Sequence, residues 1–116
     1  MAVAAHASGT QSATVTTEHS LTTVTVTGVF TFHVDCVNMA AGDIVELRVY
    51  QIILTGGTKH VLLFTTFYGA QLTDDTVKMS IPVANELGDA SSLEFTLKQT
   101  FGTSRNYAWK VLKIAA

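Results

Sequence analysis

Apolar and polar residues alternate along much of this chain, and the pattern is clearest over residues 44–68. Apolar residues at every second position of 45–49 have charged neighbours, which is the two-residue period of a β-strand with one buried face. Apolar side chains then occupy both parities of residues 60–68, so both faces of that strand are expected to be largely dry, either in the middle of the structure or against a partner. Gly56 and Gly57 suit a two-residue turn, whose central positions need positive φ. The pattern predicts a central β-hairpin over 44–68.

The same alternation, interrupted by turn residues, predicts the other strands. Pro82 is the only proline and has no N–H to donate, so its end of the strand is expected at a sheet edge or outside the ladder. Residues 84–92 are long enough for one helical turn or a crossover between sheets. Further strands are predicted at 13–27 (one edge-like strand or a pair), 29–36, 77–83, 93–101 and 107–114. The fold class is therefore all-β, an antiparallel β-sandwich (jelly-roll or Ig-like) of about seven to eight strands.

The N-terminal residues differ from the rest of the chain. Residues 1–12 contain little to anchor them beyond Val3, which indicates a flexible N-terminal arm. We therefore predict an N-terminal arm or edge strand at residues 1–20 and a single β-sandwich domain at 21–116. An extended arm can add a strand to the edge of a partner's sheet through main-chain hydrogen bonds. The residues with suitable β character, which we predict to form this partner-binding arm, are Thr14, Val15, Thr16 and Thr17.

The composition favours a protein that assembles with other protein. Charged residues make up only 14% of the 116 residues and hydrophobic residues 47%, whereas charged residues are about 25% of an ordinary soluble domain. Apolar surface beyond the needs of one small core generally marks an interface. We therefore expect a homo-oligomer, a dimer or a trimer. The alternative is a monomer whose many threonines only reflect β propensity.

Several partner classes are not expected. The net charge is −2, and the Lys and Arg residues are scattered singly, whereas a nucleic-acid partner requires a basic stripe. Glu46 and Arg48 interrupt the longest apolar run, which falls short of the roughly 20 residues of a membrane span. The first residues have no basic segment followed by an apolar core, so we expect no signal peptide. Cys36 is the only cysteine, which excludes an intramolecular disulfide and predicts a core residue.

Candidate chemistry is sparse. The histidines at positions 6, 19, 33 and 60 form no HxH or HxxxH pair, so no metal site is expected. His33 and Asp35 are predicted to share one face of a strand. The Asp74-Asp75 pair is interpreted as a solvated turn because it lacks the further oxygen ligands of a calcium loop. We expect no catalytic residues and no cofactor, and therefore not an enzyme.

Four stretches carry a resemblance to a known class of proteins. They are Gly-Val-Phe-Thr-Phe-His-Val-Asp at 28–35, Met-Ala-Ala-Gly-Asp-Ile-Val-Glu-Leu-Arg-Val-Tyr at 39–50, Gly-Gly-Thr at 56–58 and Lys-Gln-Thr-Phe-Gly-Thr-Ser-Arg-Asn-Tyr-Ala-Trp-Lys-Val-Leu at 98–112. In this order, over roughly residues 28–114, the chain resembles small β-sandwich virion proteins of tailed bacteriophages. Head decoration or cement proteins are the most similar of these in size, low charge and all-β character.

The resemblance implies a non-enzymatic structural protein that binds and stabilises the assembled phage head. Its location would be the capsid surface of the virion after synthesis in the host cytoplasm, and its partners would be the major capsid protein or other virion proteins. A neck, tail or spike-base component of the same virion is an alternative. A different class, a carbohydrate-binding module, is also considered because Tyr68, Tyr107 or Trp109 could stack on a sugar.

Overall fold

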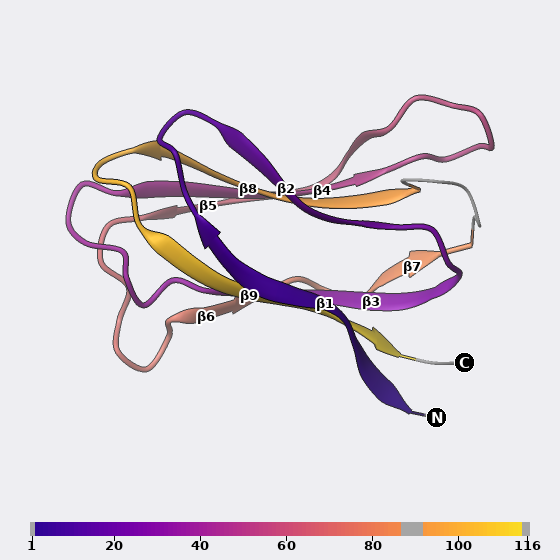
Figure 1. The fold of residues 1–116 in the computed structure, drawn as a ribbon, viewed down its shortest axis with the longest axis horizontal. Helices are drawn as coiled ribbons and strands as arrows, with labels where there is room; N and C mark the ends of the chain where they lie inside the picture. The colour runs from indigo at the N-terminus through magenta and orange to yellow at the C-terminus, as the bar shows by residue number, and fades with distance from the viewer. Residues whose placement is uncertain (1, 87–91, 115–116) are drawn as a thin grey trace.

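The structure, a computed structural model, describes residues 2–86 and 92–114 and shows two layers of β-strands (Figure 1). The strands alternate with turns and loops, and the described residues contain no helix. The strands are β1 (Val3–Ser12), β2 (Glu18–Val24), β3 (Gly28–Asp35), β4 (Ile44–Gln51), β5 (His60–Tyr68), β6 (Val77–Met79), β7 (Val83–Asn85), β8 (Leu93–Phe101) and β9 (Asn106–Ile114).

Each layer is an antiparallel sheet. The first sheet has the order β1-β9-β3-β6, and β7 also pairs with β3. The second sheet has the order β2-β8-β4-β5. The prediction of an all-β antiparallel sandwich is confirmed, with nine strands in the described residues instead of seven to eight.

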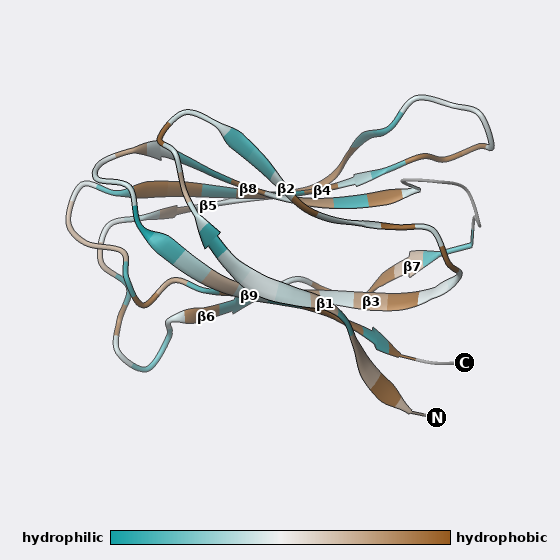
Figure 2. Ribbon diagram, in the orientation of Figure 1, coloured by the Kyte–Doolittle hydropathy of each residue, from teal (hydrophilic) through white to brown (hydrophobic). Residues whose placement is uncertain are grey.

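The core lies between the two sheets and is formed by alternating apolar side chains of the strands. Figure 2, which colours the ribbon by residue hydropathy, shows hydrophobic and hydrophilic stretches following one another along the strands. Phe32 of β3 and Phe95 of β8 meet across it, with ring centroids 5.3 Å apart. Cys36 is fully buried, as predicted, and burial raises the pKa of its thiol to about 11. A thiol with this pKa is protonated at neutral pH, so Cys36 acts as a small core residue.

The hairpin of β4 and β5 is confirmed, but its turn and its position differ from the prediction. The connection spans residues 52–59, because the N–H of Ile52 donates to the carbonyl of Ser92 (3.0 Å) and the chain leaves the β4–β5 ladder there. Gly56 has a φ of +78° in this loop. β5 lies at the edge of its sheet, and its outer face is exposed. The prediction that both of its faces are dry was therefore wrong for the isolated chain.

The strand predicted at 77–83 is divided into β6 and β7, which both pair with β3. Between them Ser80 replaces a ladder pair: its N–H donates to the carbonyl of Phe32 (2.8 Å), and its hydroxyl accepts the N–H of Phe32 (2.9 Å). Pro82 follows outside both strands, in agreement with its missing N–H. Of the crossover expected at 84–92, residues 87–91 lie outside the described part of the chain.

The first residues form an edge strand of the sandwich. β1 pairs with β9 from Val3–Ile114 to Ser12–Asn106, with a bulge between Ala5 and Ala7. The flexible arm predicted for residues 1–12 is thus a paired strand over 3–12, because main-chain bonds to β9 hold it without apolar anchors.

Candidate functional site

β5 presents an apolar, unpaired edge. It is the last strand of the second sheet, and its free edge is paired with no strand in the described residues. Phe64 is 50% exposed and Tyr68 69%, and Val61 and Leu62 are each about half exposed. An exposed, long and apolar edge strand is a template for pairing with another chain.

Exposed apolar side chains continue into the segments next to β5. Ile53 and Leu54 lie in the first part of the β4–β5 loop, the part that Figure 2 colours as hydrophobic, and Leu72 lies in the loop after β5. Ile81 is also exposed, and together with Leu62 it lines a surface groove between β5 and the β6–β7 segment. The apolar surface therefore extends from the β5 edge around this side of the sandwich.

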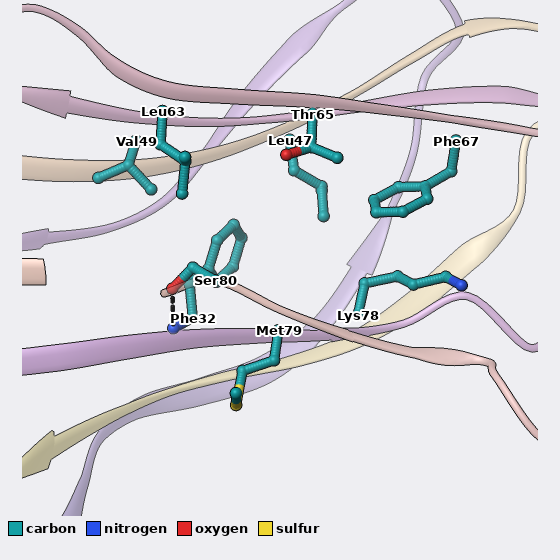
Figure 3. A pocket seen from close by; sticks show the side chains of 9 residues that line it. All are labelled: Phe32, Leu47, Val49, Leu63, Thr65, Phe67, Lys78, Met79 and Ser80. Carbon is teal, nitrogen blue, oxygen red and sulfur yellow. Dashed lines mark hydrogen bonds between the residues drawn. The ribbon is translucent and has the colours of Figure 1, made fainter. Parts of the chain in front are cut away.

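A small opening separates the two sheets on the same side (Figure 3). Leu63, Thr65 and Phe67 of β5 point across it toward β6, and the space has a volume of about 60 Å³. Lys78 of β6 lies beside it, with its Nζ 5.0 Å from the centre of the Phe67 ring and 3.2 Å from Asp75 Oδ2. The space could hold a few waters or one small apolar group. This is too small for a substrate site.

A polar cluster covers the outer face of the second sheet. The carboxylate of Glu18 accepts hydrogen bonds from the hydroxyls of Tyr50 (2.6 Å) and Thr96 (2.7 Å), and Lys59 forms an ion pair with Glu94. Burial raises the pKa of Glu18, but these bonds and nearby cations lower it by more, so the net shift is downward. Burial and the bond to Glu18 raise the pKa of Tyr50 to about 12. Glu18 is thus ionised and Tyr50 neutral at pH 7, and their bond joins β2 to β4.

Arg48 connects this polar cluster to β5. Its guanidinium lies over the Phe64 ring, 4.4 Å from the ring centre, and its Nη2 is 2.8 Å from Glu46 Oε1. Its Nη1 is buried and has no hydrogen-bond partner in the described residues. Arg48 therefore holds the exposed Phe64 ring in place by a cation–π contact.

A second polar network holds two loops at one end of the sandwich. Asp43 is 1% exposed, and its carboxylate accepts the N–H groups of Ala40 (2.9 Å) and Thr103 (3.1 Å) and the Nε–H of Arg105 (2.9 Å). Burial raises the pKa of Asp43, but these hydrogen bonds and the Arg105 charge lower it by more. Buried Gln99 continues the network by accepting from the Tyr107 hydroxyl (3.0 Å). These bonds fix loops and leave the Asp43 carboxylate no access to a ligand.

The residues predicted to form a partner-binding arm lie in the turn that crosses from the first sheet to the second. Thr16 has a φ of +72°, and its N–H donates to the carbonyl of Gln99 (2.7 Å). The N–H of Thr17 donates to the carbonyl of Thr14 (3.0 Å), and Val15 lies between them. The extended conformation that strand addition requires is therefore absent from Thr14–Thr17, because these contacts form a tight turn instead.

The other sequence candidates are also engaged within the fold. His33 and Asp35 lie on one strand face, but His33 bonds to Thr31 (2.9 Å) and Asp35 accepts the N–H of Val37 (3.0 Å). Burial and the nearby Lys110 lower the pKa of His33. In residues 2–86 and 92–114, no three His, Cys, Asp or Glu side chains are placed to hold a metal ion.

Of the three rings considered for sugar stacking, Tyr107 is fully buried and Trp109 packs against the core. Tyr68 alone of these three is exposed. A flat platform of several rings, as a stacking site would need, is therefore not formed by them.

Sequence reasoning did not identify the polar cluster. Glu18 lies 32 residues from Tyr50 and 78 from Thr96, and alternation predicts faces but not which strands are neighbours. No protein-family model, curated protein or solved structure matches this chain. Among the described residues there is no helix long and apolar enough to cross a membrane. The fold and the site together define a β-sandwich with an apolar, unpaired sheet edge.

Proposed function

We propose that this protein is a non-enzymatic structural subunit that works by assembling with other protein. The observation that supports this proposal most is the apolar surface formed by the free edge of β5 and the adjoining Ile53, Leu54 and Leu72. Monomeric proteins rarely expose contiguous apolar patches above a few hundred Å², and larger ones mark interaction sites.

The polar groups favour a structural role over catalysis. The three carboxyl or phenol groups with the clearest partners, Glu18, Tyr50 and Asp43, use their hydrogen bonds to join strands and loops. A general acid or base must instead reach a substrate proton at hydrogen-bond distance. The apolar opening beside Phe67 has a volume of only about 60 Å³. A larger hollow of about 470 Å³ is lined by His33 and Asp35, whose side chains bond to Thr31 and to the N–H of Val37.

The more specific proposal is a capsid decoration or cement subunit of a tailed bacteriophage, located on the virion surface and bound to the major capsid protein. It rests on the sequence resemblance over roughly residues 28–114. A two-layer sandwich with buried polar networks at its loops is a rigid body, as clamping of neighbouring capsid subunits would require. If many copies bind to a regular shell, contacts that are weak individually together give stable attachment to the capsid.

The test is to locate and count the protein in purified virus particles from the source of this chain. Quantitative mass spectrometry would give the copy number, and a cryo-EM reconstruction would give the position. We expect copies distributed over the whole shell. A single ring at one vertex would replace the decoration role by the neck or tail alternative, and absence from the particles would overturn the virion proposal.

A further inference from the structure

We propose that two copies of this chain pair through their β5 strands, antiparallel and about a two-fold axis. The two four-stranded sheets would then form one continuous eight-stranded sheet in the order β2-β8-β4-β5-β5-β4-β8-β2. The inference deepens the proposed function by naming the self-association surface, and it rests on the proposal that the chain works by assembly. The occupant of the β5 edge is a second copy of the same strand.

The other sheet edges carry features that oppose pairing. β6 and β7 have three residues each, and Pro82 stands between them. β2 has a bulge and begins with Glu18. β1 has a bulge, and Val3 is its only large apolar residue, so it offers a second copy little apolar surface. Short strands, prolines, charges and bulges are the means by which natural sheets avoid association at their edges. β5 has nine residues. Its one bulge lies near its start, between Val61 and Leu63, so Leu63–Tyr68 pair with β4 in regular register.

The sequence of β5 is compatible with itself in an antiparallel pair. Residues 60–68 contain no Asp, Glu, Lys or Arg, so no fixed like charges oppose each other. A two-fold axis normal to the sheet places residues of the same face opposite each other. The exposed apolar residues Leu62, Phe64 and Tyr68 of one copy would therefore lie beside those of the other. Cross-strand pairs of aromatic and apolar residues stabilise a sheet.

The charges nearest to the proposed axis are balanced within each copy. On the adjacent strand β4, the Arg48 guanidinium is paired with the Glu46 carboxylate at 2.8 Å. Arg48 stands directly opposite Phe64 in the β4–β5 ladder. The two copies would consequently approach each other without a net repulsion from this strand.

The exposed apolar side chains supply part of the area that a dimer needs. Aromatic side chains can bury about 150–250 Å² each, so the half-exposed Phe64 and more exposed Tyr68 offer on the order of 200 Å² per copy. Val61, Leu62 and the loop residues Ile53 and Leu54 enlarge the patch. A standard interface buries about 800 Å² per partner, and the main chain of the paired strand would supply a further part. The patch would otherwise remain in contact with water in every copy.

The first test is the mass of the native chain in solution, with Phe64→Glu as the disrupting variant. At about 100 µM chain, above the micromolar Kd of many interfaces of standard size, sedimentation equilibrium should give twice the 12.4 kDa chain mass. A glutamate at position 64 faces Arg48 within its own copy, so folding should be retained, whereas the two copies would repel across the axis. The Kd should rise at least about 30-fold, as for loss of an interface hot spot.

Phe101→Glu is the matched control. Phe101 is a 63% exposed phenylalanine of the same sheet, but it lies on β8, two strands away from the free edge. The control adds the same charge and should leave the dimer intact. A monomeric native chain, a closed trimer, or equal weakening by both variants would each overturn the inference, because two-fold edge pairing closes at two copies.

Hydrogen exchange of the native chain keeps the inference testable if Phe64→Glu fails to fold. In the dimer, the β5 amides that point away from β4 should exchange more slowly at high than at low protein concentration. Exchange of these amides that does not depend on concentration would overturn the pairing. A chain that dimerises through β5 but is absent from virus particles would overturn the capsid role and leave the pairing in place.

Discussion

Asp43 holds two loops together through one buried carboxylate. Its oxygens accept from Ala40 in its own connection and from Thr103 and Arg105 in the β8–β9 loop. Gly102 has a φ of +95°, and a Cβ at this position would collide with Asp43. The loop therefore has glycine both for its backbone conformation and for the space that the carboxylate occupies.

We expect Asp43→Asn to destabilise the fold by roughly 2–3 kcal/mol, because an uncharged amide with one oxygen leaves buried donors without an acceptor. Urea denaturation would measure the free energy of unfolding. Asp74→Asn is the control: Asp74 is exposed in the β5–β6 loop, and such surface changes stay within about 0.5 kcal/mol. Equal midpoints for the two variants would contradict a structural role of Asp43.

The lowered pKa of Asp43 predicts a loss of stability in acid. In the unfolded chain an aspartate has its ordinary pKa of about 3.9, and in the fold the hydrogen bonds and Arg105 hold the pKa below that value. The stabilisation is thus fully present above the unfolded pKa and is lost as the pH falls through the folded pKa. Thermal unfolding between about pH 5 and pH 2 should show a decrease in Tm. This acid-induced decrease in Tm should be smaller for Asp43→Asn than for the native chain. An equal decrease in both proteins would show that other groups cause the acid sensitivity.

At the scale of the strands, alternation predicted most of the elements and their buried faces, because burial on one face imposes the two-residue period. The strand at 93–101 has the predicted bounds, and β9 begins one residue before the predicted 107. Alternation does not specify which strands are neighbours. For this reason β5 was predicted to be central, whereas it lies at a sheet edge, where Leu63 and Phe67 on its inner face are half-buried and Phe64 and Tyr68 on its outer face are exposed.

The candidate site was harder to predict than the strands. The bonds of Glu18 depend on β2 and β4 both flanking β8, which only the three-dimensional pairing shows. The turn at Thr14–Thr17 was missed for a related reason: β propensity does not reveal that the chain must turn there to cross between sheets. The low charge content, in contrast, did indicate an exposed apolar surface, and the structure places much of it at β5 and the loops beside it.

The two open sides of the sandwich differ in the whole molecule. On one side, the edge strands β1 and β2 are close: His6 Nε2 lies 3.4 Å from the carbonyl oxygen of Thr23, and its ring packs edge-on against Phe30 at 5.4 Å. On the other side, β5 and β6 leave the narrow apolar opening of Figure 3. The molecule is therefore closed by its own N-terminal strand on one side and available to a partner on the other.

This asymmetry predicts that residues 1–12 are part of the folded domain and not a dispensable arm. Their removal would free the edge of β9 and uncover the Trp109 ring, which lies so close to Gly9 that a Cβ there would be 3.5 Å from it. We expect a loss of at least about 3 kcal/mol, which corresponds to a decrease in Tm of roughly 10–15 °C for a domain near this size. Differential scanning calorimetry of the truncated chain would measure this decrease in Tm.

A synthetic peptide of residues 1–12 should restore the Tm of the truncated chain by pairing with β9 again, with a scrambled peptide as the control. An unchanged Tm after truncation would instead support a free N-terminal arm.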